Sequence, residues 1–415
     1  MNSSRSKPAP PLLTVAMPVY KGGRHEGRLL RRSLDSLLQQ TFQDFKVLIV
    51  DNDSPDADDT AKIVSQYVKR DSRFLFRKNS ANIGPYSNFA GLIMACDSEY
   101  YIDFHFDTYL APTLFEECLK VLEADPEAVI AYSHCQFVDE VGNLLDLYKD
   151  TADFAHEDPG QRYLNVLSGM GWCTAYHGVW RHKATVRAQV ETAAGRRNAS
   201  MDNNFLALAA LRGKLVQIPK PLFFRLKDDY QRKGETTETR FDRIYFAGGW
   251  YPRAFFLPFC AWIRDHCQDV LAADLPLDRK DELVHQTVSI LLKRYKHMVD
   301  YELGRAVDLV LKGEFKKGLC GPDEAPPPKG QYKYLDFVYL SQLVMDLEYA
   351  AALRPDFPKL ALARAVVRLE LGQQPEALVA LETAFRQNPA DQEIQELRAK
   401  LQKIVEAAGP AALNP

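Results

Sequence analysis

Three side chains that could bind a metal ion alternate along the segment Tyr100–Pro112. Asp103, His105 and Asp107 are spaced two residues apart, and they follow an apolar, aromatic run. Side chains with this spacing lie on one face of an extended chain, so the three would be grouped at the end of a strand. Carboxylate and imidazole groups together can hold a divalent cation. The alternative for these residues alone is the solvated polar end of a strand.

Polar residues also follow two earlier apolar runs. The turn Pro18–Tyr20 ends the run Leu12–Met17, and the acidic turn Asp51–Asp56 ends the run Phe45–Val50. An aspartate in such a turn can accept hydrogen bonds from the N–H or hydroxyl groups of a ligand without any metal. The alternative is that Asp51 caps the following helix.

The elements that must position these residues alternate between strands and helices. Short apolar runs predict strands, and apolar residues at helical spacing predict the helices between them. The expected strands are Leu12–Met17, Phe45–Val50, Phe74–Arg77, the run that opens at Tyr100, and Ala128–Tyr132. This alternation is typical of an α/β fold with a mostly parallel, Rossmann-like sheet. Ligands of such sheets bind beyond the carboxyl ends of the strands, where all three polar groups are expected.

The totals exclude several classes of protein. With 415 residues the chain should form two or three domains, and a formal net charge of −3 gives no basic field for nucleic acid. The seven cysteines form no CxxC pair, which fits a reducing compartment. Residues 1–10 lack the apolar core of a signal peptide, and no run of about 18 apolar residues is present. We therefore expect a cytoplasmic protein, with the inner face of a membrane as the alternative location.

Residues 12–230 resemble the family 2 glycosyltransferases of the GT-A fold. The resemblance rests on an ordered set of segments: Pro18–Tyr20, Ser36–Phe42, Val50–Asp56, Asn82–Gly84 with Asn88, His105–Pro112, and Met201–Asp202 with Ile218-Pro219. Two positions depart from the family pattern. His105 stands where the family usually has the first Asp of an Asp-x-Asp motif, and Asn52 stands where a second Asp is common.

The resemblance implies a nucleotide-binding site. Its residues would be Pro18, Tyr20, Asp51, Asp53, Asn82 and Gly84. The proline turn and the acidic turn would hold the base and ribose. Gly84 would let the backbone approach the nucleotide closely. For Asn82 and Gly84 the alternative is an ordinary junction between a loop and a helix.

The resemblance also implies a divalent metal held by Asp107 and His105. Because imidazole suits Mn²⁺ better than Mg²⁺, we expect Mn²⁺ as the cofactor. Two alternatives are that Asp103 contributes a ligand and that His105 contacts only phosphate. Asp202 corresponds to the family's general base, an ionised carboxylate able to take a proton from an acceptor hydroxyl. The alternative is that Asp202 only caps a helix at Asn203–Leu211.

A Gly- and aromatic-rich stretch, Gly169–Gly178, lies between these motifs. Trp172 could line the acceptor side, because aromatic faces stack on sugar rings, or it could belong to the core. The charged stretch Lys227–Arg243 is expected to form a loop that closes over the donor. Tyr245–Trp262 could cover the acceptor cleft or contact a lipid surface at the membrane periphery. A buried helix is the alternative.

The C-terminal part reads as helical throughout. The expected divisions are a tail at 1–10, the GT-A domain at 11–240, a helical region at 241–320, a linker at 321–333, a repeat region at 334–405 and a tail at 406–415. Leu347, Ala350 and Pro355 recur thirty-four residues later as Leu381, Ala384 and Pro389, which is the tetratricopeptide (TPR) period. An unrelated helical hairpin is the alternative. Repeats of this kind bind peptides or mediate self-association into homo-oligomers.

The sequence thus predicts an inverting glycosyltransferase. It would move one sugar from a nucleotide-sugar, with UDP-sugar implied by the resemblance, to a glycan or a polypeptide. The alternative from another class is a catalytically inactive GT-A domain that serves as a TPR-type scaffold. A nucleotidyltransferase is disfavoured, because no Gly-rich, basic phosphate loop follows the first strand.

Overall fold

The structure, a computed structural model of the whole chain, describes residues 10–182, 190, 201–227, 236, 238–239, 257–314 and 334–408. These residues divide into two compact units. The first comprises the described residues up to 227 together with Ala273–Leu283, and the second comprises those from 236 onward apart from that segment. The predicted linker at 321–333, the residues 245–256, and most of both tails and of the loop 227–243 lie outside the described residues.

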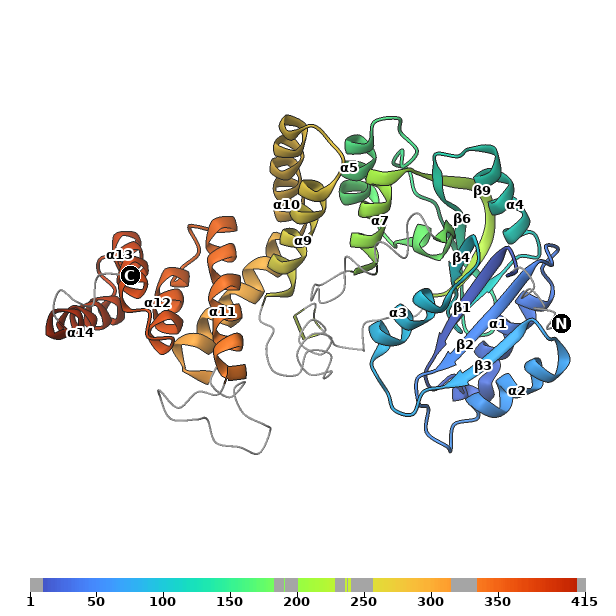
Figure 1. Cartoon of the computed structure of the whole chain (residues 1–415), viewed down its shortest axis with the longest axis horizontal. Helices are drawn as coiled ribbons and strands as arrows, with labels where there is room; N and C mark the ends of the chain where they lie inside the picture. Colours follow the sequence, from blue (N-terminus) through green and yellow to red (C-terminus); the bar gives the residue numbers. More distant parts are fainter. Residues whose placement is uncertain are drawn as a thin grey trace, which may run out of the picture. The chain divides into compact units, whose positions relative to one another are not determined.

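The first unit is built on one sheet. Nine strands of the described chain pair in the order β3-β2-β1-β4-β8-β6-β9-β5, and β7 pairs with β6. The strands are β1 (Leu13–Val19), β2 (Phe45–Asp51), β3 (Phe74–Lys78), β4 (Tyr100–Asp103), β5 (Thr108–Leu110), β6 (Ala128–Val138), β7 (Leu144–Tyr148), β8 (Val179–Arg181) and β9 (Lys214–Leu226). Figure 1 shows β1, β2 and β3 side by side.

The sheet is mostly parallel, as predicted. β1 to β4 are mutually parallel. Since β8 is antiparallel to both β4 and β6, and β9 is parallel to β6, the strands β6 and β9 point the same way as β1 to β4. Among the described strands only β5, β7 and β8 run against the others. The α/β expectation is therefore confirmed.

Helices pack around this sheet. They are α1 (Arg28–Leu38), α2 (Thr60–Arg70), α3 (Pro85–Ala95), α4 (Leu114–Ala124), α5 (Pro159–Gly169) and α7 (Met201–Arg212), with short 3-10 turns η1 (Arg24–Gly27) and η2 (Thr174–His177). Leu30, Leu34 and Leu37 of α1 are fully buried, as their spacing predicts. They belong to one core with residues of β1 and β2 such as Val15 and Val47. This core holds the carboxyl ends of β1, β2 and β4 next to one another.

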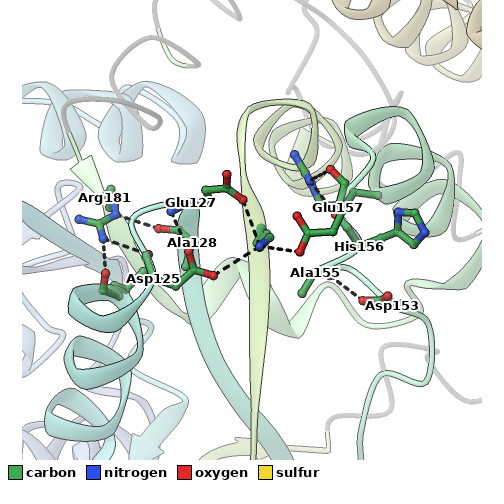
Figure 2. A network of polar contacts seen from close by, with 11 residues as sticks. Asp125, Glu127, Ala128, Asp153, Ala155, His156, Glu157 and Arg181 are labelled. Carbon is green, nitrogen blue, oxygen red and sulfur yellow. Dashed lines mark hydrogen bonds and ion pairs between the residues drawn. The ribbon is translucent and has the colours of Figure 1, made fainter.

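A polar network joins the start of β9 to two neighbouring loops. Lys214 Nζ lies 2.9 Å from Glu157 Oε1, 3.0 Å from Glu127 Oε2 and 3.7 Å from Asp125 Oδ2. Figure 2 labels these three acidic residues. Hydrogen bonds to Glu157 and Glu127 raise the pKa of Lys214. Arg181 of β8 donates to the carbonyl of Ala128 at 2.8 Å. The network thus connects the first residues of β6 and β9 with the last residue of β8. None of its residues was predicted as a site residue.

The second unit is helical, which confirms the predicted all-α region. Its helices are α9 (Pro258–Ala272), α10 (Leu277–Leu311, whose first residues belong to the first unit), α11 (Tyr334–Leu353), α12 (Leu360–Glu370), α13 (Gln374–Gln387) and α14 (Gln392–Ala408). Within it α11 to α14 pack one after another, as Figure 1 shows. Small residues such as Ala365, Ala377 and Ala384 form a common core of α12 to α14. The TPR assignment stays a prediction.

Two further observations bear on the expected membrane contact. No helix among the described residues is long and apolar enough to cross a bilayer. Trp262, at the end of the aromatic stretch, is 1% exposed and packs against Tyr295 at 4.8 Å between ring centroids. This described part of the stretch therefore forms a buried helix.

Candidate nucleotide and metal site

The turns after β1 and β2 are adjacent because the strands pair in register, with Val19 opposite Asp51. Two hydrogen bonds join the turns themselves. Asn52 N–H donates to the carbonyl of Val19 at 2.8 Å, and Lys21 N–H donates to Ser54 Oγ at 2.8 Å. The predicted base- and ribose-binding turns therefore form one connected surface at the edge of the sheet.

Asp51 has one carboxylate oxygen occupied and the other available. Its Oδ1 accepts from Ser54 N–H at 3.0 Å and from Ser54 Oγ at 2.6 Å. Its Oδ2 accepts no hydrogen bond from the described residues, although the side chain is only 1% exposed. A buried carboxylate oxygen without a partner is costly, so a ligand that donates to Oδ2 would be bound favourably.

The substitution of Asn for Asp at position 52 has a structural reason. Asn52 Nδ2 donates to Asn82 Oδ1 at 2.9 Å, while its Oδ1 accepts from Asn79 Nδ2 and from Ile83 N–H, both at 3.1 Å. An aspartate could accept both of these bonds but could not donate to Asn82. The hydrogen bonds of Asn52 thus hold the loop 79–84 in place. The sequence pattern alone did not reveal this role.

The loop that Asn52 supports ends at Gly84. Gly84 has φ +82°, and a side chain built there would meet no atom within 4 Å. Asn82 Oδ1 also accepts from Gly84 N–H at 2.9 Å. The positive φ explains the glycine, and the open space beside it leaves room for close approach of a ligand. Helix α3 begins directly after it, at Pro85.

The remaining predicted nucleotide residues lie around these turns. Tyr20 is 40% exposed, and Pro18 is half-buried within β1. Asp53 has a positive φ of 62°, and its Oδ1 lies 3.7 Å from Nζ of Lys78. Lys78, at the end of β3, was not predicted as a site residue. Its positively charged ammonium group lies beside the acidic turn.

A second cluster lies at the end of β4. Asp103, His105 and His177 each offer a ligand atom, and these three atoms lie within 4.8 Å of one another. Asp103 is 1% exposed and His177 is 7% exposed. His105 Nε2 lies 2.9 Å from Asp103 Oδ2. Two imidazoles and one carboxylate in this arrangement could hold a divalent cation.

Electrostatics ties His105 to both nearby aspartates. Burial disfavours its charged form, but the negative charges of Asp103 and, to a smaller extent, of Asp107 raise the pKa of His105 to about 9. His177 is affected in the opposite direction, since burial and the nearby charges of His105 and Arg225 hold its pKa well below the usual value. Of the two imidazoles, His105 is therefore the one that binds a proton more readily.

Asp107 lies outside the cluster of three. It is half-buried in the turn between β4 and β5, and its carbonyl accepts from Leu226 N–H at 3.4 Å. Its role as a metal ligand stays a prediction. His177, which follows His105 by 72 positions, was not predicted as a ligand because no sequence spacing links the two.

The acceptor-side stretch is anchored but leaves Trp172 open. Gly171 N–H donates to Tyr148 Oη at 3.1 Å, and Tyr148 Oη donates to Asp150 at 2.8 Å. Trp172 meets Phe137 edge-on at 5.0 Å yet stays 42% exposed. Trp172 is therefore not a core residue, and its ring is available to a ligand.

Asp202 lies inside the first turn of α7, which begins at Met201 and not at Asn203. Its carboxylate neighbours the thiol of Cys173, the residue after Trp172. Burial, together with Asp202, holds the pKa of that thiol well above its usual value. The structure therefore brings the predicted base next to the predicted acceptor stretch.

Residues 14–177 match the family model described as glycosyl transferase family 2. This part of the chain is a family 2 glycosyltransferase domain. It includes the nucleotide turns and the cation cluster, while Asp202 lies beyond the matched residues. The resemblance inferred from the motifs is thereby confirmed for the domain.

The relatives of this domain are distant. An uncharacterised glycosyltransferase of Methanocaldococcus jannaschii is 28% identical over 34% of this chain and 47% of its own length. Chondroitin synthase of Escherichia coli is 30% identical over 32% of this chain and 19% of its own length. The match thus spans less than half of either relative. The crystal structure of S. aureus TarS 1-349 with UDP-GlcNAc aligns with a TM-score of 0.49 at 17% identity, covering 90% of this chain and 91% of that one.

Proposed function

We propose that this protein transfers a single sugar from a nucleotide-sugar to an acceptor with inversion at the anomeric carbon. The observation that carries the proposal is the unpaired Oδ2 of buried Asp51 at the end of β2, two strands from the cluster of potential cation ligands at the end of β4. A nucleoside diphosphate has hydrogen-bond donors at one end and anionic phosphates at the other. Asp51 Oδ2 could accept from the donors of the nucleoside, and a cation held at the end of β4 could bind the phosphates.

The donor is proposed to be a UDP-sugar. Asp51 would accept from the base or ribose, and Pro18, Tyr20, Asp53, Asn82 and Gly84 would border the nucleotide. The unoccupied acceptor on Asp51 and the open space beside Gly84 support these positions.

The residues at the end of β4 fit a divalent cation, because the buried carboxylate of Asp103 lies close to the imidazoles of His105 and His177. His105 and Asp107 are the predicted ligands, and Mn²⁺ is proposed over Mg²⁺ because imidazole is present. When bound, the cation would offset the charge that grows on the departing diphosphate. Lys78 could add positive charge at the nucleotide turn.

Asp202 is proposed as the general base. Its carboxylate would take the proton of the acceptor hydroxyl as that oxygen attacks the anomeric carbon from the face opposite the leaving group. Its place beside Cys173, next to exposed Trp172, supports an acceptor on this side. Trp172 would stack on the acceptor sugar.

The acceptor is proposed to be a glycan or a polypeptide. The name of the Escherichia coli relative, chondroitin synthase, supports a glycan. The helical second unit, if it is a TPR-like repeat, supports a peptide or self-association. A cytoplasmic location is also proposed, and the free state of the six described cysteines is in accord with it.

Asp51→Asn tests the nucleotide site. The amide keeps an acceptor for Ser54 but replaces Oδ2 with a donor, so the variant should lose a hydrogen bond to a charged group, worth about 1.5–3 kcal/mol. We expect UDP affinity, measured by calorimetry, to fall by about tenfold or more. Asp139→Asn, a change of the same chemistry in a surface turn, should bind UDP like the wild type. If Asp51→Asn binds UDP as tightly as Asp139→Asn and the wild type do, Asp51 does not contact the nucleotide.

A further inference from the structure

The loop 171–174, on the proposed acceptor side, has a strained backbone. Cys173 has a positive φ of 51°, a value that residues other than glycine seldom adopt. Trp172, directly before it, is 42% exposed, whereas Cys173 is buried. A strained conformation persists only when the surrounding structure holds it in place. Hydrogen bonds at both ends of the loop do so.

The first end of the loop is held by Tyr148, the last residue of β7. Gly171 N–H donates to Tyr148 Oη at 3.1 Å. A Cβ at Gly171 would lie 3.0 Å from the same oxygen, so the absence of a side chain lets the backbone come this close. The Tyr148 hydroxyl in turn donates to Oδ1 of Asp150 at 2.8 Å.

The second end of the loop is held by Asp150 directly. Thr174 Oγ1 donates to Asp150 Oδ2 at 3.2 Å, and Thr174 is buried. Tyr132 of β6 also hydrogen-bonds with this carboxylate. One buried carboxylate therefore accepts from three hydroxyl groups, and two of these hydroxyl groups lead to opposite ends of the loop.

The three hydroxyl groups explain how the interior tolerates Asp150. Burial raises the pKa of Asp150, whereas its hydroxyl partners oppose the shift by donating to the ionised form. Hydrogen bonds to an ionised group are stronger than those between neutral groups, so this carboxylate fixes its partners firmly. The backbone of Asp150 is fixed as well. The Gln217 amide of β9, with its orientation assigned from these contacts, donates to the Asp150 carbonyl at 3.2 Å and accepts from its N–H at 3.0 Å.

We propose that Asp150 is a positioning residue for the acceptor. Through two of its hydroxyl partners it holds both ends of the loop 171–174. The loop in turn exposes the Trp172 ring and keeps Cys173 beside Asp202. The role toward an acceptor rests on the proposed function, in which Trp172 and Asp202 face the acceptor. The restraint on the loop does not rest on it.

Tyr148→Phe tests the restraint without any turnover. The phenyl ring still packs against Phe137 but offers no acceptor to Gly171 N–H, so this amide of the full chain should exchange at least about fivefold faster. The released loop should also expose the Cys173 thiol, and its alkylation by iodoacetamide, followed by mass spectrometry, should accelerate. Tyr109→Phe is the matched control, because the Tyr109 hydroxyl of β5 makes no hydrogen bond within the described chain. Unchanged exchange and alkylation in Tyr148→Phe would overturn the restraint.

Kinetics separate a positioning role from a merely structural one. Transfer by the Mn²⁺-loaded full chain is measured on a panel of oligosaccharides that end in glucose, galactose or N-acetylglucosamine, and the one that the wild type glycosylates fastest is used. Asp150→Asn leaves one acceptor oxygen where the carboxylate has two, and Thr174→Val removes one of the donors. Each should raise the KM for the oligosaccharide at least about fivefold while UDP-sugar hydrolysis without an acceptor keeps its rate. Thr174→Ser keeps the hydroxyl and should restore the wild-type KM.

The outcomes distinguish this proposal from the proposed function. An unchanged KM in both variants, or a parallel loss of transfer and hydrolysis, would overturn the positioning role of Asp150. The absence of turnover in the wild type would instead contradict the proposed function, and with it the acceptor role, while amide exchange would still decide the restraint on the loop. Circular dichroism checks that each variant is folded, and Thr174→Val gives the comparison if Asp150→Asn does not fold.

Discussion

Asp51 and Asn52 are neighbours at the end of β2, and they differ in how many of their side-chain polar atoms are hydrogen-bonded within the protein. Asp51 keeps one acceptor oxygen unpaired toward a ligand, whereas both polar atoms of Asn52 are engaged by the loop 79–84. An acidic pair at these positions would supply two carboxylates but would lose the donor that Asn82 requires. At the residue scale, the departure from the family pattern therefore supports a loop and does not remove a ligand.

Asn52→Asp tests this assignment. The change keeps both acceptor bonds but sets a carboxylate oxygen against Asn82 Oδ1, so the loop should loosen while the fold remains. We expect faster amide exchange at Ile83 and Gly84, whose N–H groups the network binds, and a UDP affinity several-fold weaker. Asn143→Asp, in the turn after β6, provides the control. Unchanged exchange at both amides would show that Asn52 does not hold the loop.

At the scale of elements, the parallel half of the sheet was readable from the sequence. Apolar runs predicted β1, β2 and β3 to within two residues. β1 and β2 are largely buried and therefore carry mostly apolar side chains, whereas the edge strand β3 is mostly exposed. The strands β5 and β8 have three residues each, too few for a pattern to emerge. β9 contains Pro219 and Pro221, and prolines argue against a strand when only the sequence is known.

The same distinction applies to the candidate site. Asp51, Asn82, Gly84 and His105 could be predicted because their motifs are local and follow one another in order. His177 could not, because only the pairing of β4 with β8 brings it to the end of β4. The hydrogen bonds of Asn52 were equally hidden, since they join residues about 30 positions apart.

Glu302 joins two helices of the second unit. It lies on α10, and its carboxylate accepts from the N–H groups of Phe259 at 2.8 Å and of Cys260 at 2.7 Å, in the first turn of α9. Complete burial raises the pKa of Glu302 to about 8, although these donors oppose the shift. The folded protein thus holds a proton there that the unfolded chain releases, because a glutamate in water has an ordinary pKa of 4.5.

This shift predicts how stability depends on pH. Between about pH 4.5 and pH 8 the folded state binds one more proton than the unfolded state at this position, so the free energy of unfolding should fall as pH rises. The contribution is at most about 1.4 kcal/mol per pH unit. Glu302→Gln cannot titrate, so denaturant unfolding at pH 5, 6, 7 and 8 should show a shallower decline than in the wild type. Parallel declines would contradict the raised pKa.

At the scale of the whole molecule, the helical unit is one packed body. Arg264 of α9 lies 3.0 Å from Asp346 of α11, whose side chain is 5% exposed. Removing the chain after the linker would therefore leave Arg264 without this partner and would uncover α9. Point substitutions on exposed positions of α12 to α14, such as Val379, which is 66% exposed, test a peptide-binding or self-association role more cleanly than a truncation does.

The central claim is that the family 2 domain transfers sugar with Asp202 as base. The most direct measurement incubates the Mn²⁺-loaded full chain with a panel of nucleotide-sugars and acceptor glycans and follows release of the nucleoside diphosphate. We expect turnover with a UDP-sugar. Asp202→Asn, which keeps the shape but cannot take a proton, should lower the rate of transfer by about 10²–10⁴-fold at unchanged UDP affinity. Wild-type transfer that is undiminished in Asp202→Asn, or no turnover with any donor in the panel, would contradict it.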